Sequence, residues 1–301
     1  MLAVVGTVPD QSFPVVCGRI ELKGGELEIG GHRVGVGRGT PALLAAACLT
    51  VRHFGAAPVL AHLAGDVGLG DGSRKLYRAL VEDLPRADYP VLAFHYLLPD
   101  VDWHNQVLFA IEEMIRRPVL IADAGFMYAA KMSGQAPAYD LFTPDIGELA
   151  FLADEKAPHP FYTRGFILHE DNRAPDLIAR AYEHDNAARY LLVKGGRDYL
   201  AGRSGVLETI DSPGVEVLEA IGGTGDTLTG LVAALVSVGF ELKEAAVLAS
   251  RTNRLAGHLA RPSPATPITE IVSRIPEALD SLTSRPAKLH QQRSSAAGAP
   301  D

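Results

Sequence analysis

The 301-residue sequence is poor in cysteine and in positive charge. It contains only Cys17 and Cys48, which excludes a disulfide framework or a cysteine metal site and favours two reduced thiols in a cytoplasmic protein. The formal net charge of −8 argues against a nucleic-acid partner or an anionic membrane, since either would need a basic patch. A nucleotide is not excluded, because a few backbone N–H groups and a metal ion can hold phosphates on an acidic protein.

Long apolar runs are also missing. None approaches the roughly 20 residues that span a bilayer. The opening segment Met1–Gly6 is predicted as a first strand. We expect no signal peptide, because the segment has neither the basic start nor the apolar length of one. We therefore expect no membrane partner. Hydrophobic residues make up 47% of the chain and charged residues 21%, the balance of a globular enzyme rather than a disordered chain.

The most informative stretch is the glycine-rich segment Gly222–Gly230. A short apolar run at 215–217, interpreted as a strand, leads into it, and apolar residues recur at helical spacing after it. Glycines let backbone N–H groups converge at a helix start, where the helix dipole favours an anion. The acidic residue there, Asp226, has two interpretations. It accepts a proton from a hydroxyl that attacks a phosphoryl group held by the loop, or it caps the helix.

Strand and helix patterns alternate along much of the chain. We predict strands at 2–5, 58–64, 91–96, 118–122, 140–142 and 190–193, helices at 41–54, 73–82, 103–116, 146–153 and 173–187, and a loop from Asp123. This order predicts a parallel sheet covered by helices on both faces, with the ligand beyond the carboxyl ends of the strands. Asp66, Asp123 and Glu148 follow strands and are therefore expected at that edge.

Four other segments differ from this pattern. Residues 13–37 carry alternating residues and glycine pairs, which predict a small antiparallel lid. The glycine-dense segment 35–39 is either a second ligand surface or a plain loop before a helix. Residues 159–169 are expected to be irregular, and 284–301 to form a disordered tail, which leaves 1–283 as one domain. The ten histidines are scattered, and we expect structural roles for all of them.

With these parts in order, the chain resembles the ribokinase-like superfamily over about residues 2–280. The shared features are a first strand followed by Asp10, the lid, a glycine-rich segment before a helix, the loop Gly65-Asp66-Val67-Gly68-Leu69-Gly70, and the glycine loop with its carboxylate. The resemblance implies an α/β fold, a three-layer α/β/α sandwich with a mostly parallel central sheet and a small antiparallel β lid.

Two branches of the superfamily compete. The run Gly223-Thr224-Gly225-Asp226 looks like the phosphofructokinase-B-type sugar kinases, whereas Gly222, the segment 143–149 and Lys194-Gly195-Gly196 are closer to the NAD(P)H-hydrate dehydratases. The first strand, the lid and the Gly-Asp loop favour the kinase branch. We therefore expect phosphoryl transfer from ATP (or ADP) to a hydroxyl of a sugar, nucleoside or related alcohol. The alternative is an NAD(P)H-hydrate dehydratase, which phosphorylates the hydroxyl of its substrate and then eliminates the phosphate. The third hypothesis is a non-catalytic relative that binds a nucleotide or a metabolite.

The resemblance also implies roles for individual residues. It makes Asp226 the general base. The other implied roles are an anion hole at Gly222, Gly223, Thr224 and Gly225; nucleotide binding at Lys194, Gly195, Gly196 and Asn253; substrate binding at Asp10, Gly37, Gly39 and Asp123; and Mg²⁺ binding at Glu148 and Asp145.

One residue departs from both branches. Asp145 stands where the sugar kinases carry Asn and the dehydratases carry His, and its extra negative charge either helps to hold a metal or disfavours phosphate.

The lid indicates how the protein assembles, because an antiparallel flap has unpaired edges that a second copy would cover. We expect a small-molecule substrate and a homodimer formed through the lid.

Overall fold

The computed structural model describes residues 1–160 and 174–283 of the chain. Its centre is a nine-stranded sheet with the strand order β12-β11-β10-β9-β8-β7-β1-β6-β2. The strands from β6 to β10 in this order are parallel, and β2, β11 and β12 are antiparallel to their neighbours. The bounds are β1 Leu2–Val8, β2 Val16–Arg19, β6 Leu60–Gly65, β7 Val91–His95, β8 Val119–Ala122, β9 Leu141–Phe142, β10 Tyr190–Val193, β11 Asp198–Gly202 and β12 Gly205–Ile210.

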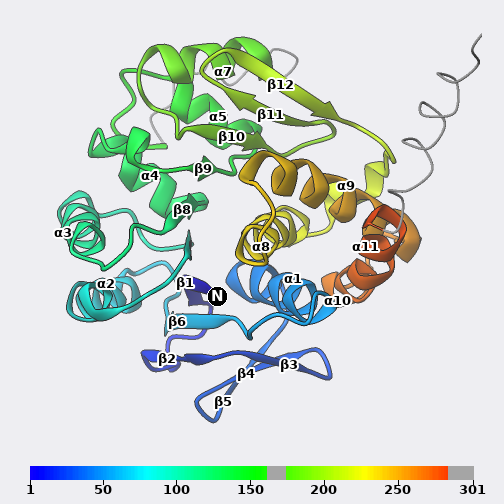
Figure 1. The fold of residues 1–301 in the computed structure, drawn as a ribbon, viewed down its shortest axis with the longest axis horizontal. Helices are drawn as coiled ribbons and strands as arrows, with labels where there is room; N and C mark the ends of the chain where they lie inside the picture. The colour runs from blue at the N-terminus through cyan, green and yellow to red at the C-terminus, as the bar shows by residue number, and fades with distance from the viewer. Residues whose placement is uncertain (161–173, 284–301) are drawn as a thin grey trace, which may run out of the picture.

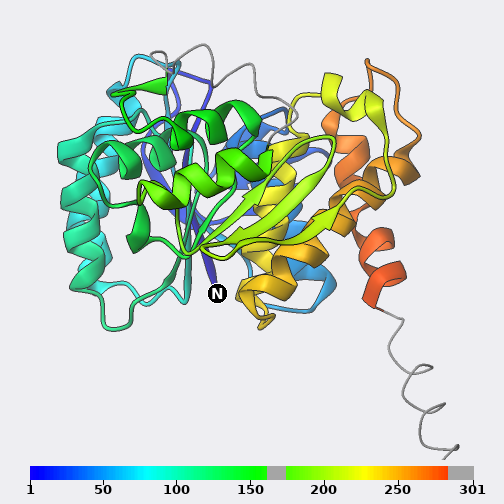
Figure 2. The ribbon, with the colours of Figure 1, turned by 90° about the horizontal axis from the view of Figure 1, so that it is seen from above.

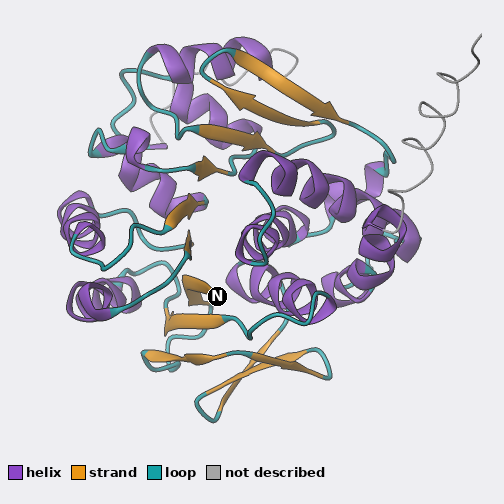
Figure 3. Ribbon diagram, in the orientation of Figure 1, coloured by secondary structure: helices purple, strands orange, loops and turns teal. Residues whose placement is uncertain are grey.

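Helices cover both faces of this sheet (Figures 1 and 3). One layer holds α1 Thr40–His53, α8 Thr224–Ser237, α9 Leu242–Ala260, α10 Ile268–Ser273 and α11 Ile275–Thr283. The other holds α2 Asp71–Asp83, α3 Val101–Glu112, α4 Ala124–Met132, α5 Ile146–Ala153 and α7 Ala174–Glu183. Seen from above, α2 and α3 lie at one side of the molecule and α9 to α11 at the other (Figure 2). The predicted three-layer α/β/α fold is confirmed.

The alternation of side chains along β1 divides the core into two. Leu2 and Val4 pack into the cluster beneath α1 and α8, whereas Ala3 and Val5 pack into the cluster beneath α2 to α7. All seven residues of β1 are buried, which explains why the sequence shows a continuous apolar run rather than an alternation. In the part of the chain that the structure describes, no helix is long and apolar enough to cross a membrane.

Close packing brings α1 against α8. A Cβ on Gly230 would lie 2.1 Å from the carbonyl oxygen of Leu43, so only glycine fits at this crossing. A Cβ on Gly6 would lie 2.6 Å from the side chain of Thr40, which places the start of α1 directly against β1. These contacts hold the amino ends of both helices near the carboxyl ends of the central strands.

The structure corrects three predicted segments. The loop after Asp123 is in fact α4, which begins at Ala124 with Asp123 as its N-cap. The strand expected at 215–217 is wrong, because Glu216–Ala220 forms a 3₁₀ helix. Part of the predicted lid belongs to the main sheet, because β2 pairs with β6.

The remainder of the lid forms a separate antiparallel sheet of β3 Glu21–Lys23, β4 Glu26–Ile29 and β5 His32–Gly35. Its Leu27 and Ile29 are buried in the core under α1, so this sheet packs on the body of the protein. The predicted disordered tail at 284–301 and most of the irregular segment 159–169 lie outside the described residues. The one-domain assignment and the homodimer stay predictions.

Candidate active site

Asp226 lies in the first turn of α8, at the carboxyl edge of the sheet. The helix begins after Gly223, whose φ of 105° suits glycine. The Asp226 carboxylate accepts the backbone N–H of Gly39 at 2.6 Å through Oδ2, and Oδ1 lies 3.0 Å from Nε2 of His95. Both oxygens therefore contact groups outside α8, and the interpretation of Asp226 as a simple helix cap is wrong.

His95, the last residue of β7, is the site residue that the sequence analysis missed. It is fully buried, and its Nδ1 lies 3.0 Å from Oγ1 of Thr40 while its Nε2 contacts Asp226. Burial opposes ionisation of Asp226, but the hydrogen bond and charge of His95 and the cation of Lys194 outweigh it and hold the pKa of Asp226 below its usual value. A single histidine at the end of a strand has no characteristic spacing to other ligand residues, so the sequence does not mark it as functional. Only the fold shows that it contacts Asp226.

An ion pair between the part-buried Lys194 and the buried Asp123 lies beside this contact. Lys194 Nζ is 2.9 and 2.8 Å from the two carboxylate oxygens of Asp123. Asp123 also accepts hydrogen bonds from the backbone N–H of Ala124 at 2.8 Å and from the hydroxyl of Thr229 at 2.6 Å. Burial opposes the charge on Lys194, yet the carboxylates of Asp123 and Glu148 keep its pKa above the usual value. Lys194 is therefore a permanent cation within the site.

The cation of Lys194 reaches the glycine loop. A Cβ on Gly225 would lie 3.6 Å from Lys194 Nζ, so the ammonium group stands against the first turn of α8. The following Gly195 is fixed on both sides, because its N–H donates to Asp198 at 3.1 Å and its carbonyl accepts from Arg254 at 2.9 Å. The structure thus brings the predicted nucleotide segment 194–196 next to the predicted anion hole.

The anion hole at Gly222–Gly225 is open at the start of α8, where the first N–H groups of a helix have no partner within it. Arg38 crosses this loop, since its Cδ would lie 3.5 Å from a Cβ on Gly222. Asn253 binds the start of α8 through two hydrogen bonds. Its side-chain NH₂ donates to the carbonyl of Thr224 at 2.9 Å, and its side-chain oxygen accepts from the hydroxyl of Thr227 at 2.7 Å. Asn253 thus fixes the shape of the loop in this structure.

The predicted metal ligands form the N-terminus of α5. Asp145 and Glu148 make a capping box, in which each side chain accepts the other's backbone N–H at 2.8 Å. The hydroxyl of Tyr128 donates to Glu148 at 2.9 Å. Burial, followed by the negative charge of Asp123, raises the pKa of Glu148 to about 8. Carboxylate oxygens are the ligands that Mg²⁺ prefers in proteins, so the neighbouring side chains of Asp145 and Glu148 fit a magnesium ion.

Among the other predicted residues, the side-chain hydrogen bonds of Asp10 and Asp66 are local. Asp10 is exposed, and its carboxylate accepts the N–H and hydroxyl of Ser12 at 2.9 and 2.7 Å. Gly37 faces open space. Asp66 organises its own loop by accepting from Gly68, Gly70 and Ser73. The substrate roles of Asp10 and Gly37 stay predictions.

His95, Asp123 and Asp226 offer ligand atoms within 4.8 Å of one another. A metal there would have to displace the Lys194 ammonium, which already neutralises Asp123.

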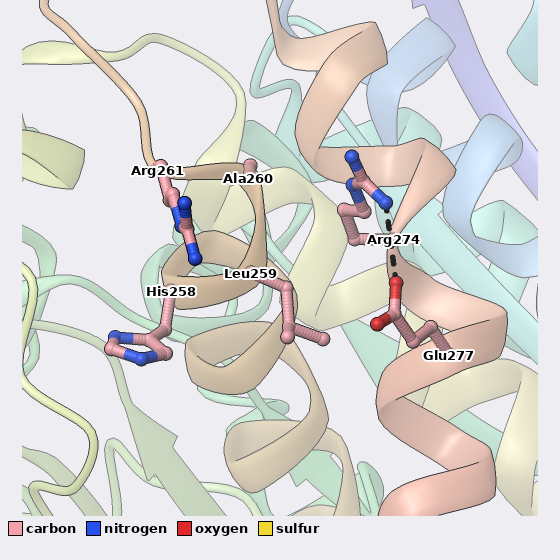
Figure 4. A pocket seen from close by; sticks show the side chains of 6 residues that line it. All are labelled: His258, Leu259, Ala260, Arg261, Arg274 and Glu277. Carbon is pink, nitrogen blue, oxygen red and sulfur yellow. Dashed lines mark hydrogen bonds and ion pairs between the residues drawn. The ribbon is translucent and has the colours of Figure 1, made fainter.

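A pocket of about 370 Å³ lies between the end of α9 and the start of α11 (Figure 4) and is lined by His258, Leu259, Ala260, Arg261, Arg274 and Glu277. None of these lining residues belongs to the site around Asp226.

Solved structures define the fold. A ribokinase-like superfamily protein from Enterococcus faecalis gives a TM-score of 0.56 at 15% identity, covering 93% of this chain and 86% of that one. An ADP/ATP-dependent NAD(P)H-hydrate dehydratase from Bacillus subtilis, co-crystallised with ATP and Mg²⁺, gives 0.56 at 15% identity with 93% and 89% coverage. Phosphofructokinase-2 from Escherichia coli gives 0.53 at 15% identity with 93% and 99% coverage. The protein therefore has the ribokinase-like fold.

Sequence comparison narrows the class to a family. Residues 97–277 match the family model described as NAD(P)H-hydrate dehydratase, and the chain belongs to this family. The uncharacterized protein MJ1337 of Methanocaldococcus jannaschii is 42% identical over 239 residues, which is 79% of this chain and 98% of that protein. The bifunctional NAD(P)H-hydrate repair enzyme Nnr of Pyrobaculum aerophilum is 28% identical over 187 residues, or 60% of this chain.

The match to the repair enzyme covers 34% of its length, so the chain spans about a third of that relative. The prediction that the protein is an enzyme of the ribokinase-like superfamily is confirmed. The expectation that it is a sugar-type kinase is not confirmed, because the dehydratase alternative fits the family match better.

Proposed function

We propose that the protein is a nucleotide-dependent NAD(P)H-hydrate dehydratase. It would transfer a phosphoryl group from ATP or ADP to the ring hydroxyl of hydrated NADH or NADPH and then release phosphate. The observation that carries the phosphoryl-transfer step is the Asp226 carboxylate, held at the amino end of α8 by Gly39 and His95. The family match supports the choice of substrate.

Asp226 has the position of a general base. Its low pKa leaves it ionised at neutral pH, and it can accept the hydroxyl proton as the oxygen–phosphorus bond forms and the bond to the nucleotide breaks. The departing phosphate then takes the ring oxygen with it, and loss of a proton from the neighbouring carbon restores the double bond. His95 keeps the carboxylate in one orientation through its contact with Oδ1.

The phosphates would lie on the glycine loop. The free N–H groups at the start of α8 and the ammonium of Lys194 converge there, and both stabilise the charge that spreads over a transferring phosphoryl group. We infer that Asp123 acts by holding Lys194, because the residue is buried and both of its carboxylate oxygens contact the ammonium group. Glu148 and Asp145 would hold Mg²⁺, which neutralises phosphate charge when bound.

A coupled assay tests this proposal. The protein is incubated with Mg²⁺, ATP or ADP, and hydrated NADH, and the return of dihydronicotinamide absorbance is followed together with released inorganic phosphate. We expect both signals in equal amounts. Nucleotide binding without either signal would contradict the dehydratase, and consumption of ATP with a sugar or nucleoside panel would then support the kinase.

A further inference from the structure

Tyr96 follows directly after β7 in a backbone conformation that is unfavourable for a large side chain. Its φ is 52°, and the residue is 50% exposed. The hydroxyl of Thr7 donates to its carbonyl oxygen at 2.6 Å and fixes this conformation. Backbone strain of this kind persists where the surrounding structure enforces it, and it concentrates at functional sites.

The ring of Tyr96 shares its neighbours with the proposed base. It stands edge-on to the His95 ring, with centroids 4.4 Å apart and an interplanar angle of 87°. Two of its ring carbons would lie 3.6 Å from a Cβ on Gly39, the residue whose N–H binds Asp226. The ring of the half-exposed Tyr96 therefore lies beside both groups that contact the Asp226 carboxylate.

Apolar side chains extend this surface. The described residues include ten exposed large apolar side chains, and four of them lie on the two loops that follow β6 and β7, namely Val67, Leu69, Tyr96 and Leu98. The two loops touch, because a Cβ on Gly70 would lie 2.3 Å from Cδ2 of Leu98. The backbone N–H of Leu98 also donates to the hydroxyl of Ser73, in the first turn of α2, at 3.0 Å. Because β6 and β7 both flank β1, their carboxyl ends meet at the edge that holds Asp226.

We propose that Tyr96 is the stacking platform for the conjugated carboxamide part of the hydrated nicotinamide ring, with Val67, Leu69 and Leu98 forming the apolar rim. This inference rests on the proposed function. The part of this ring that is conjugated with the carboxamide is planar, and a planar conjugated group gains from an aromatic face and from apolar neighbours. Its hydroxyl would then lie within reach of Asp226, because the platform and the base share Gly39 and His95 as neighbours. Tyr96 thereby determines which acceptors bind, without taking part in proton transfer.

Two substitutions separate the ring from the backbone. Tyr96→Asn removes the ring, and asparagine tolerates a positive φ, so the variant should fold with an unchanged or higher Tm. Tyr96→Phe retains the ring. Phe109→Ala removes another exposed aromatic ring, on α3, and serves as the matched control.

We expect Tyr96→Asn to raise the KM for hydrated NADPH about tenfold, with the KM for ATP within twofold, whereas Tyr96→Phe and Phe109→Ala stay within twofold of wild type. A KM within twofold for Tyr96→Asn would overturn the inference while the proposed function stands. Equilibrium dialysis of hydrated NADPH separates the two claims. Ring-dependent binding without turnover would refute the dehydratase alone, and absence of binding would overturn both.

Discussion

Gly39 donates its backbone N–H to the carboxylate of Asp226 at 2.6 Å, across 187 residues of chain. The contact joins the amino ends of α1 and α8, and the φ of 77° at Gly39 suits glycine there. A glycine-rich loop after the lid and a carboxylate near the end of the chain thus form one site. His95 completes it from the sheet between them.

Asp226→Asn should reduce turnover about 10²- to 10⁴-fold, because the amide cannot accept a proton from the substrate. Nucleotide affinity should stay within a few-fold, since the loop N–H groups and Lys194 remain. Single-turnover kinetics and nucleotide titration measure the two effects. Asp102→Asn, in the first turn of α3, is the control for losing a charge near a helix start. Retained turnover in Asp226→Asn would rule out the base.

Lys194→Met should destabilise the protein by about 3–5 kcal/mol, because it leaves the buried Asp123 carboxylate without its cation. The double variant Lys194→Met/Asp123→Asn should recover part of that loss, since no buried charge remains unpaired. Urea unfolding of the four proteins in this cycle measures the coupling. Additive effects would show that the pair contributes nothing beyond its separate members.

Glu148→Gln should raise the Mg²⁺ concentration needed for half-maximal rate. Without metal, the raised pKa of Glu148 means that its contribution to stability is complete below its usual value of 4.5 and is lost as the pH rises toward about 8. The variant should therefore lose less stability than wild type between pH 5 and pH 8, in the presence of a chelator. Unchanged metal dependence would remove Glu148 from the magnesium site.

Stability should also fall on the acid side because of His104. This buried residue lies 2.8 Å from the hydroxyl of Tyr139, and burial lowers its pKa from 6.5 to about 4. The unfolded chain therefore takes up the proton first, so a contribution of up to about 3 kcal/mol, present above pH 6.5, is lost as the pH falls toward 4. Urea unfolding between pH 7 and 5 measures the slope. His104→Gln should flatten it, and an equal slope would contradict the assignment.

Gly230→Ala should destabilise the protein by about 1–3 kcal/mol, because its Cβ would overlap the Leu43 carbonyl at 2.1 Å. Forcing α8 away from α1 should also lengthen the contact between Asp226 and Gly39 and lower turnover. Gly35→Ala, where a Cβ meets open space, is the control. Thermal unfolding and initial rates report both effects, and a Gly230→Ala protein as stable and active as Gly35→Ala would refute this packing argument.

Local patterns in the sequence were sufficient to predict the helices and strands that have strong hydrophobic periodicity. The predicted helix 146–153 and strand 190–193 have the bounds of α5 and β10. The short helix α4 was missed because Gly125 weakens its pattern, and the 3₁₀ helix before the glycine loop was missed because five residues are too few to show a period. The glycine loop itself was visible because its residue types are required by backbone geometry.

The sequence by itself determined that Asp226 follows a glycine loop at a helix start, and that the chain builds a parallel sheet between two helical layers. Only the tertiary structure decided which groups surround that carboxylate. Strand β1 lies between β6 and β7, so the ends of segments far apart in the chain meet at one edge. This strand order depends on packing across the whole core, which no local pattern encodes, and it brings His95, Gly39 and Lys194 to Asp226.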